Sequence, residues 1–279
     1  MADQPLNSQP LQTGLVRAPQ MSRMTLCVND DSLDVAIVSK VEDNSLIYRH
    51  IPYTATATSA IRALEEAVYD NPLLLSDFGQ IDILFDTHRF IVIPEERADD
   101  DRAEEMLETL YPDIEFEPVT SRIPGGAVIA AAVNADIERF AGRTFADARR
   151  MHRIVPLCRY FGARNRSGNG GRIHVHLRPG FTDVIAYLHG RTMMANTFSS
   201  PSGMDALYYI LAAAQNLRFD DSCDRMIVSG DNTLRDTLMP MLRKYYPHAM
   251  PAIFPSAMLR AGAAAMQAPF EMLAMPLCE

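Results

Sequence analysis

The 279-residue sequence contains no tryptophan and only four cysteines. The cysteines form no C-x-x-C pair, so neither a zinc knuckle nor a dithiol redox motif is indicated. They are Cys27, Cys158, Cys223 and Cys278. We expect reduced thiols in a cytoplasmic protein. Long hydrophobic runs are also lacking, because no stretch approaches the roughly 20 apolar residues that a membrane span requires.

Positive charge is scarce as well. The chain has 26 Lys and Arg against 35 Asp and Glu, which gives a formal net charge of −9. A protein that neutralises nucleic-acid phosphates needs a basic face, so this balance argues against nucleic-acid binding. A local basic patch around the Gly-rich stretch after Phe161 is the alternative, although such a run is usually a solvated loop. Its members are Arg159, Arg164, Arg166 and Arg172.

The two ends of the chain differ in character. Residues 1–21 are polar and rich in Gln and Pro, without the apolar core of a signal peptide, and we expect a disordered tail over residues 1–23. Ala and Met dominate residues 257–275, but Pro269 interrupts this run and Glu271 adds a charge. We therefore expect packed C-terminal structure there.

The most informative pattern is an order of elements that occurs twice. Each copy consists of a strand, a tight polar turn, a second strand, a third strand and a helix. In the first copy the turn spans residues 29–32, and Thr58 or Ser59 is the expected N-cap of the helix. The expected elements are Thr25–Val28, Leu33–Val38, Leu46–Ile51 and Ser59–Tyr69, then Arg172–Leu177, Phe181–Leu188, Arg191–Phe198 and Gly203–Asn216.

Further strands and helices alternate after each copy. This succession is expected of α/β layers in which helices cover a mixed sheet. We expect Ile81–Phe85 and Arg89–Pro94 to form a strand pair, and Thr144–Tyr160 to form a helix interrupted near Pro156. The remaining expected elements are a helix at Asp99–Leu110, a buried strand at Ala127–Val133, a helix at Ala135–Ala141 capped by Asn134, a strand at Arg225–Val228 and a helix at Asn232–Tyr245.

Two lobes of this plan resemble the actin-like ATPase fold, which is shared by actin, sugar kinases, heat-shock ATPases and type IV pilus assembly proteins. More narrowly, the chain resembles a bacterial domain-of-unknown-function family with this fold, in Arg89–Glu95, Phe145–His152, Ser229–Asp231 and Leu277–Glu279. The resemblance implies an α/β, ribonuclease H-like fold of two duplicated lobes, each a mixed sheet flanked by helices. We expect the first lobe, with its connecting helix, over residues 24–161 and the second over residues 162–279.

In ATPases of this fold, the first hairpin of each lobe carries Asp-x-Gly. The Asp helps to hold hydrated Mg²⁺, and the Gly lets backbone amides approach the phosphates. The matching triplets here are Asn29-Asp30-Asp31 and Arg178-Pro179-Gly180. An Arg in place of the carboxylate repels the cation, and an extra Asp repels the phosphate. A register shift of one would place Asp30 at the acid position. The resemblance therefore implies a nucleotide cleft with degenerate catalytic groups.

A Gly-Gly turn supports the adenosine in the same fold, and Ser229-Gly230-Asp231 stands in its place. Partial loss would weaken nucleotide binding without excluding it, since adenine is held largely by shape and apolar contact. We assign no catalytic residue and no metal ligand, and we expect no cofactor, with ATP and Mg²⁺ as the alternative. The residues implied to face the cleft are Asn29, Asp30, Asp31, Arg178, Gly180, Thr182, Asp183, Ser229, Gly230 and Asp231.

Two other patterns have simple structural explanations. His174 and His176 share one face of a strand, which suits a metal ion only if a third ligand converges, and no third ligand is evident in the sequence. His152 is expected to be a packed or interfacial histidine rather than the partner of a nucleophilic Cys158.

Two functions from different classes follow. The first is a non-catalytic scaffold, a pseudo-ATPase that binds a protein partner, with the apolar residues 253–277 as a partner surface. The second is an ATPase or kinase whose metal ligands come from unusual positions. We favour the scaffold, because the enzyme requires several acids to converge on one point. The candidate acids are Asp30, Asp31, Asp183 and Asp231.

Overall fold

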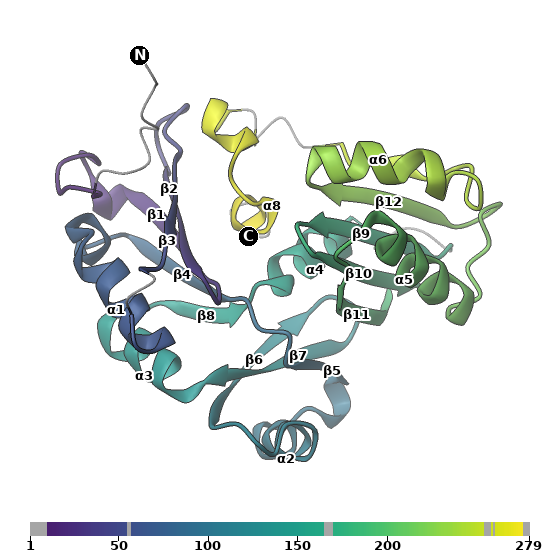
Figure 1. The fold of residues 1–279 in the computed structure, drawn as a ribbon, viewed down its shortest axis with the longest axis horizontal. Coiled ribbons are helices and arrows are strands. Elements are labelled where there is room, and N and C mark those ends of the chain that lie inside the picture. Colours follow the sequence, from purple (N-terminus) through teal and green to yellow (C-terminus); the bar gives the residue numbers. More distant parts are fainter. Residues whose placement is uncertain (1–9, 55–56, 165–169, 254–257, 259, 276–279) are drawn as a thin grey trace.

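The structure is a computed structural model that describes residues 10–54, 57–164, 170–253, 258 and 260–275. Two five-stranded sheets form the bases of two lobes, and a three-stranded sheet extends from the first lobe. Helices α4 (Ile154–Ala163) and α8 (Phe270–Ala274) lie in the middle of the molecule, between the two large sheets (Figure 1). No helix among the described residues has the length and hydropathy needed to cross a membrane.

The first lobe is built on a mixed sheet in the order β3-β2-β1-β4-β8. Its strands are β1 (Ser22–Val28), β2 (Ser32–Ser39), β3 (Ile47–Pro52), β4 (Gln80–Phe85) and β8 (Arg149–His152). The first three pair antiparallel, and β4 and β8 join parallel. Helices α1 (Ala60–Tyr69) and α3 (Ala135–Thr144) pack beside each other, and the expected caps Ser59 and Asn134 both accept hydrogen bonds from helix N–H groups.

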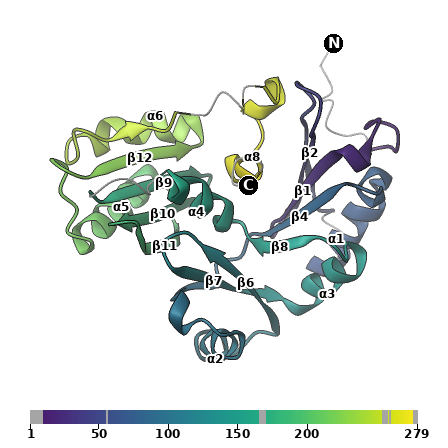
Figure 2. The same cartoon turned by 180° about the vertical axis from the view of Figure 1, so that it is seen from behind.

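The second lobe repeats this order as β11-β10-β9-β12-β13, with the same parallel and antiparallel pairs. Its strands are β9 (Arg172–Arg178), β10 (Phe181–Leu188), β11 (Arg191–Ser199), β12 (Arg225–Gly230) and β13 (Met250–Pro251). Helices α5 (Gly203–Asn216) and α6 (Asn232–Leu242) cover one face of this sheet, as Figure 2 shows from behind. The predicted duplication is confirmed, because strand for strand the two sheets have one topology.

An insertion distinguishes the first lobe from the second. Between β4 and α3 the chain forms a separate sheet in the order β5-β7-β6, covered by α2. The elements are β5 (Phe90–Pro94), α2 (Asp100–Leu110), β6 (Phe116–Ile123) and β7 (Ala127–Asn134). The expected pair of β4 with β5 is therefore wrong. β4 pairs with β1 and β8, and β5 pairs with the distant β7, so non-local pairing decided against the local hairpin.

The helix expected over Thr144–Tyr160 is confirmed from Ile154 onward and is wrong before it. Residues Arg149–His152 form β8, the parallel neighbour of β4, and α4 begins only at Ile154. Pro156 lies in the first turn of α4, where its missing N–H costs no hydrogen bond. The physical reason for the error is that an edge position beside β4 stabilises an extended conformation that the local sequence does not signal.

The N-terminal prediction fails in part. The side chain of Leu11 is buried, and its N–H donates to Oδ1 of Asn71 at 2.7 Å. Residues Pro19–Met21 form a 3-10 turn, and β1 starts at Ser22. Residues 10–23 are thus anchored to the first lobe rather than forming a disordered tail, because Leu11 supplies apolar area to the first core, although most of the side chains between Leu11 and Ser22 are exposed. Residues 1–9 lie outside the described part.

The C-terminal segment crosses back to the first lobe, although the predicted boundary assigns it to the second. Residues 260 and 261 accept backbone hydrogen bonds from Asn44 and Leu46, and Phe270–Ala274 are buried in the first lobe's hydrophobic core. Packed C-terminal structure is therefore confirmed. A partner surface over residues 253–277 is not found in α8, whose side chains face this chain's own core.

His174 connects the second sheet to α4. Its ring is buried, lies stacked at 4.1 Å from the ring of Phe161, and neither ring nitrogen has a hydrogen-bond partner. Burial and the charge of Arg172 lower the pKa of His174 to about 3. His174 is therefore neutral in the folded protein at pH values where the unfolded chain would protonate it.

We expect this histidine to make the protein less stable below about pH 6.5. The unfolded state binds a proton there and the folded state does not, so the free energy of unfolding should fall as pH falls, by about 1.4 kcal/mol per pH unit for one such group. His174→Phe should reduce that slope. Urea denaturation at pH 5 and pH 7.5 measures both slopes, and equal slopes in wild type and His174→Phe would contradict the assignment.

Candidate functional site

Strand register places a row of polar side chains across the second sheet. His176 lies opposite Asp183 on one side and Ser229 on the other, and Asp183 lies opposite Thr197. The Thr197 hydroxyl donates to Oδ1 of Asp183 at 2.7 Å, and Nδ1 of His176 and Oγ of Ser229 are 3.0 Å apart. All these groups lie on the face opposite α5 and α6, so the row faces the first lobe.

The first lobe contributes a buried arginine to this row. Arg153 follows the last residue of β8, and its N–H donates to the carbonyl of Phe85 at the end of β4. Nε of Arg153 donates to Asp86 at 2.7 Å, and Nη2 donates to Asp183 at 2.5 Å. The Arg153 side chain is 1% exposed. One guanidinium therefore joins carboxylates from the two lobes.

Two further charged residues complete the cluster. Arg178, at the end of β9, donates to Asp86 at 2.7 Å and lies 3.5 Å from Asp183. Glu271 of α8 lies 3.5 Å from Arg153 and 3.3 Å from Nε2 of His176. We call Asp86, Arg153, His176, Arg178, Asp183 and Glu271 the junction cluster.

Pairing keeps the three carboxylates of the junction cluster ionised. Burial raises the pKa of the Asp86 carboxyl, but Arg153 and Arg178 outweigh it and lower the pKa to about 2. The same opposing effects leave the pKa of Asp183 far below its ordinary value. Burial also raises the pKa of Glu271, while contact with His176 and the charges of both arginines lower it to about 2. Three carboxylates are therefore charged at neutral pH in a buried site.

The two phosphate-type hairpins use their altered residues in the same way. Cys27 lies opposite Asp34 in the first hairpin, as His176 lies opposite Asp183 in the second. Two residues further on, Nδ2 of Asn29 donates to Asp34 at 2.8 Å, and Arg178 contacts Asp183. Asn29 and Arg178, which the resemblance aligns with a metal-facing acid, thus both contact a carboxylate of their own lobe.

The other predicted cleft residues are dispersed. Asp31 accepts a hydrogen bond from Ser32 within its own turn, and Asp231 caps α6 through the N–H of Leu234. The Thr182 hydroxyl is 2.7 Å from that of Ser200, on the face away from the junction cluster. Gly180 has a φ of +77°, and its carbonyl accepts from the N–H of Ser200. These residues serve local structure.

Gly230 has a packing role. Its φ is +96°, and a Cβ there would lie 2.0 Å from the backbone oxygen of Leu177 in the neighbouring strand. Only glycine fits such a position. The glycine at this turn is therefore explained by the close approach of β12 and β9, without a nucleotide.

The candidate metal ligands do not converge. Within residues 10–54, 57–164, 170–253 and the described C-terminal positions, no three His, Cys, Asp or Glu side chains are arranged to hold a metal ion. His174 and His176 do share a buried face, but their rings contact Phe161 and Ser229 respectively. Asp183 pairs with arginines, whereas Asp31 and Asp231 serve turns.

Sequence reasoning missed most of the junction cluster. Asp86 is part of an expected turn, and Arg153 lies inside an expected helix. Glu271 carried a signal, because it is a single acid within the apolar sequence Phe270–Met275, and buried acids of this kind need a cationic partner. The location of that partner depends on the tertiary structure.

The other cysteine and histidine interpretations agree with the structure. His152 is buried, its Nε2 is 2.7 Å from the Thr87 carbonyl oxygen, and its ring lies 4.2 Å from that of Phe90. Of the described cysteines, Cys27 and Cys158 are buried free thiols and Cys223 is an exposed one. Cys278 lies outside the described residues.

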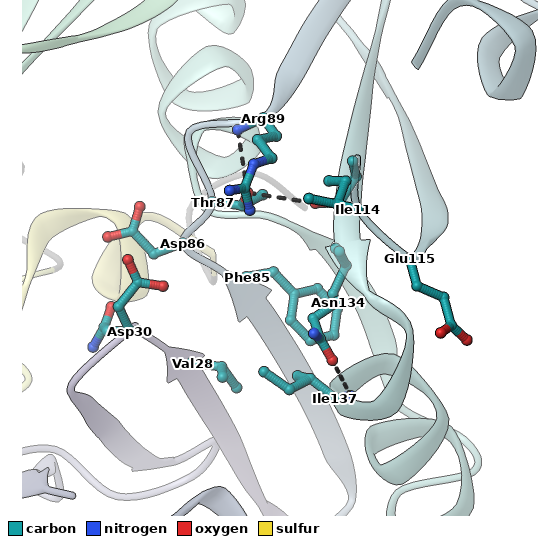
Figure 3. Close-up of a pocket in the computed structure, with 13 residues that line it drawn as sticks. Val28, Asp30, Phe85, Asp86, Thr87, Arg89, Ile114, Glu115, Asn134 and Ile137 are labelled. Atoms are coloured by element: carbon teal, nitrogen blue, oxygen red, sulfur yellow. Dashed lines mark hydrogen bonds between the residues drawn. The ribbon is translucent and has the colours of Figure 1, made fainter. Parts of the chain in front are cut away.

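A separate cavity of about 250 Å³ opens where the ends of β1, β4 and β7 meet α3. Val28, Phe85 and Ile137 provide apolar walls (Figure 3). Asp30 and Asp86 lie at one end of the cavity, and Glu115 lies at the other. Asp30 and Asn29 are thus the predicted cleft residues that line this cavity.

Comparison with known proteins agrees with this architecture. A family model described as "Protein of unknown function (DUF3822)" matches residues 17–249, well over half of the chain. The chain belongs to this family. No curated protein sequence matches it. The family assignment confirms the resemblance to a family of unknown function, and it supplies no activity.

Solved structures confirm the actin-like ATPase fold. A crystal structure from Bacteroides thetaiotaomicron, described as a protein with actin-like ATPase fold and unknown function, has a TM-score of 0.75 and 20% identity, covering 93% of this chain and 97% of that chain. A structure described as the PilM–PilN type IV pilus biogenesis complex has a TM-score of 0.53 and 14% identity, covering 94% and 100%. At these identities the likeness shows the fold alone.

We expect Arg153→Met to lower the free energy of unfolding by about 3–5 kcal/mol, since it removes one partner from two buried carboxylates. Arg139→Met is the matched control. Arg139 is half-exposed and pairs with the exposed Glu115, so its loss should cost less than about 1 kcal/mol. Urea denaturation at pH 7 compares the two, and similar stabilities would show that the junction cluster contributes little.

Proposed function

We propose that this DUF3822 protein is a non-hydrolysing scaffold that binds a protein partner. The observation that supports this proposal is the position of Arg153 between Asp86 and Asp183. A divalent cation at the lobe junction would compete with an internal cation that is held by several buried contacts. The guanidinium of Arg153 therefore supplies the positive charge at the lobe junction that a metal ion would supply in an ATPase.

Helix α8 adds a steric argument. Its Phe270 ring lies 5.0 Å from the ring of Tyr160 and 6.1 Å from the ring of His176, so the helix occupies space beside the junction cluster. A ligand that entered between the lobes would have to displace α8. The alternative of an ATPase or kinase with unusual metal ligands has no such observation in its favour.

Wild-type protein should bind neither ATP nor ADP in a Mg²⁺-dependent manner, because Arg153 and Arg178 repel the cation and the carboxylates repel the phosphates. Isothermal titration calorimetry with each nucleotide, with and without Mg²⁺, tests this expectation, and a phosphate-release assay is the companion measurement. Binding that tightens with Mg²⁺ together with turnover would establish an enzyme and reject the scaffold.

Partner binding is supported by two observations. The PilM–PilN structure joins a protein of this fold to a partner in one complex. In the present protein, the cavity beside β1 and α3 combines apolar walls with three acids, Asp30, Asp86 and Glu115, against one lining cation, Arg89. This excess of negative charge complements a peptide that presents an apolar side chain next to a basic one. We propose this cavity as the docking point of the partner.

Peptides selected from a random displayed library on the wild-type protein should be enriched in Lys or Arg beside a large apolar residue. Their affinity should fall at least tenfold for Asp30→Arg, which reverses a charge at the mouth of the cavity. Asp77→Arg, an exposed acid outside the cavity, is the control and should bind normally. Selected peptides that bind both variants equally would place the docking surface elsewhere.

A further inference from the structure

Helix α8 is covalently continuous with the second lobe but packs on the first. Its five residues are all buried, and it contacts α4 and β1. The Phe270 ring lies against Tyr160 and Phe161 of α4, with centroid distances of 5.0 and 5.9 Å. Helix α8 therefore packs at the lobe junction as a bound peptide packs in a groove. Phe270 is its aromatic anchor and Glu271 is its buried acid.

The acid of α8 is held by both lobes. Arg153 comes from the end of β8 in the first lobe, and His176 comes from β9 in the second. Glu271 lies 3.5 Å from Arg153 and 3.3 Å from Nε2 of His176. Arg153 is much closer to the other two carboxylates, since it donates to Asp86 at 2.7 Å and to Asp183 at 2.5 Å. Glu271 is thus the most loosely held carboxylate of the junction cluster, and its Oε2 is buried without a hydrogen bond.

Charge counting restricts what the site can accept. Arg153 and Arg178 together carry two positive charges, which Asp86 and Asp183 already balance. His176 contacts one further carboxylate, that of Glu271, at 3.3 Å. A phosphate chain would bring more negative charge into a buried site that already holds two carboxylates. The site therefore selects a single carboxylate on an apolar peptide over a nucleotide.

We propose that the lobe junction is a binding site for a short apolar helix that carries one carboxylate, with α8 as its resident ligand in cis, exchangeable with the same segment supplied in trans. The ligand class is defined by residues 267–275, Gln-Ala-Pro-Phe-Glu-Met-Leu-Ala-Met. This site shares only Asp86 of the junction cluster with the cavity beside α3, and it remains intact if the docking proposal for that cavity fails.

The test uses a fluorescein-labelled synthetic peptide of residues 267–275 and the full-length chain, with fluorescence anisotropy as the readout. In wild type the resident helix competes with the peptide. A full-length double variant, Phe270→Ala with Glu271→Gln, weakens that competitor, so it should bind the labelled peptide at least tenfold more tightly than wild type does. The same peptide with Glu271→Gln should bind the double variant at least tenfold more weakly.

Three results would overturn the proposal. The first is a folded double variant, judged by circular dichroism and melting, that does not bind the peptide at millimolar concentration. The second is equal affinity for the peptide with and without its carboxylate. The third is displacement of the labelled peptide by ATP as efficient as displacement by unlabelled peptide, which would define a general anion site.

A second measurement does not depend on the double variant. The wild-type chain has no tryptophan, so Phe270→Trp introduces a single reporter at the junction. Its emission should shift to longer wavelength when excess unlabelled peptide displaces the resident helix. An unchanged spectrum at saturating peptide would show that α8 does not exchange.

Discussion

The buried guanidinium of Arg153 is the interaction on which the junction of the two lobes depends. A charge that is 1% exposed would be very costly alone, so its side chain requires Asp86 from the first lobe and Asp183 from the second at hydrogen-bond distance. These carboxylates in turn require Arg178, and Glu271 lies against both Arg153 and His176. The relative placement of the lobes follows from this reciprocal requirement.

The duplicated topology explains why the altered hairpins remain structurally similar. In each lobe the second strand carries a buried Asp, Asp34 or Asp183, at the same register position. Asp34 accepts hydrogen bonds from Asn29 and Tyr48 and lies 2.8 Å from Nδ1 of His50. Asp183 is paired instead with the charged side chains of Arg153 and Arg178. The two lobes thus share a backbone plan but differ in charge at the same place, and the net effect favours internal pairing over an external cation.

The C-terminal segment links the two halves a second time. It accepts backbone hydrogen bonds from residues 44 and 46 of the first lobe and delivers Glu271 to a cluster that includes His176 of the second. The apolar sequence around Phe270 is therefore a helix that packs in the core, and its single acid, Glu271, contributes one carboxylate to the junction cluster. In the proposed function, the space that a nucleotide would need belongs to this helix.

The sequence by itself determined the repeated strand and helix order and the capping residues Ser59 and Asn134, because these depend on local periodicity and short-range hydrogen bonds. The resemblance also implied that Arg178 stands where ATPases of this fold carry an acid. Only the tertiary structure decided that Arg153 meets Asp183, that β5 leaves β4 for β7, and that Glu271 returns to the junction. Those contacts join residues far apart in the chain, and the free energy that selects them comes from burial and charge pairing that no local pattern encodes.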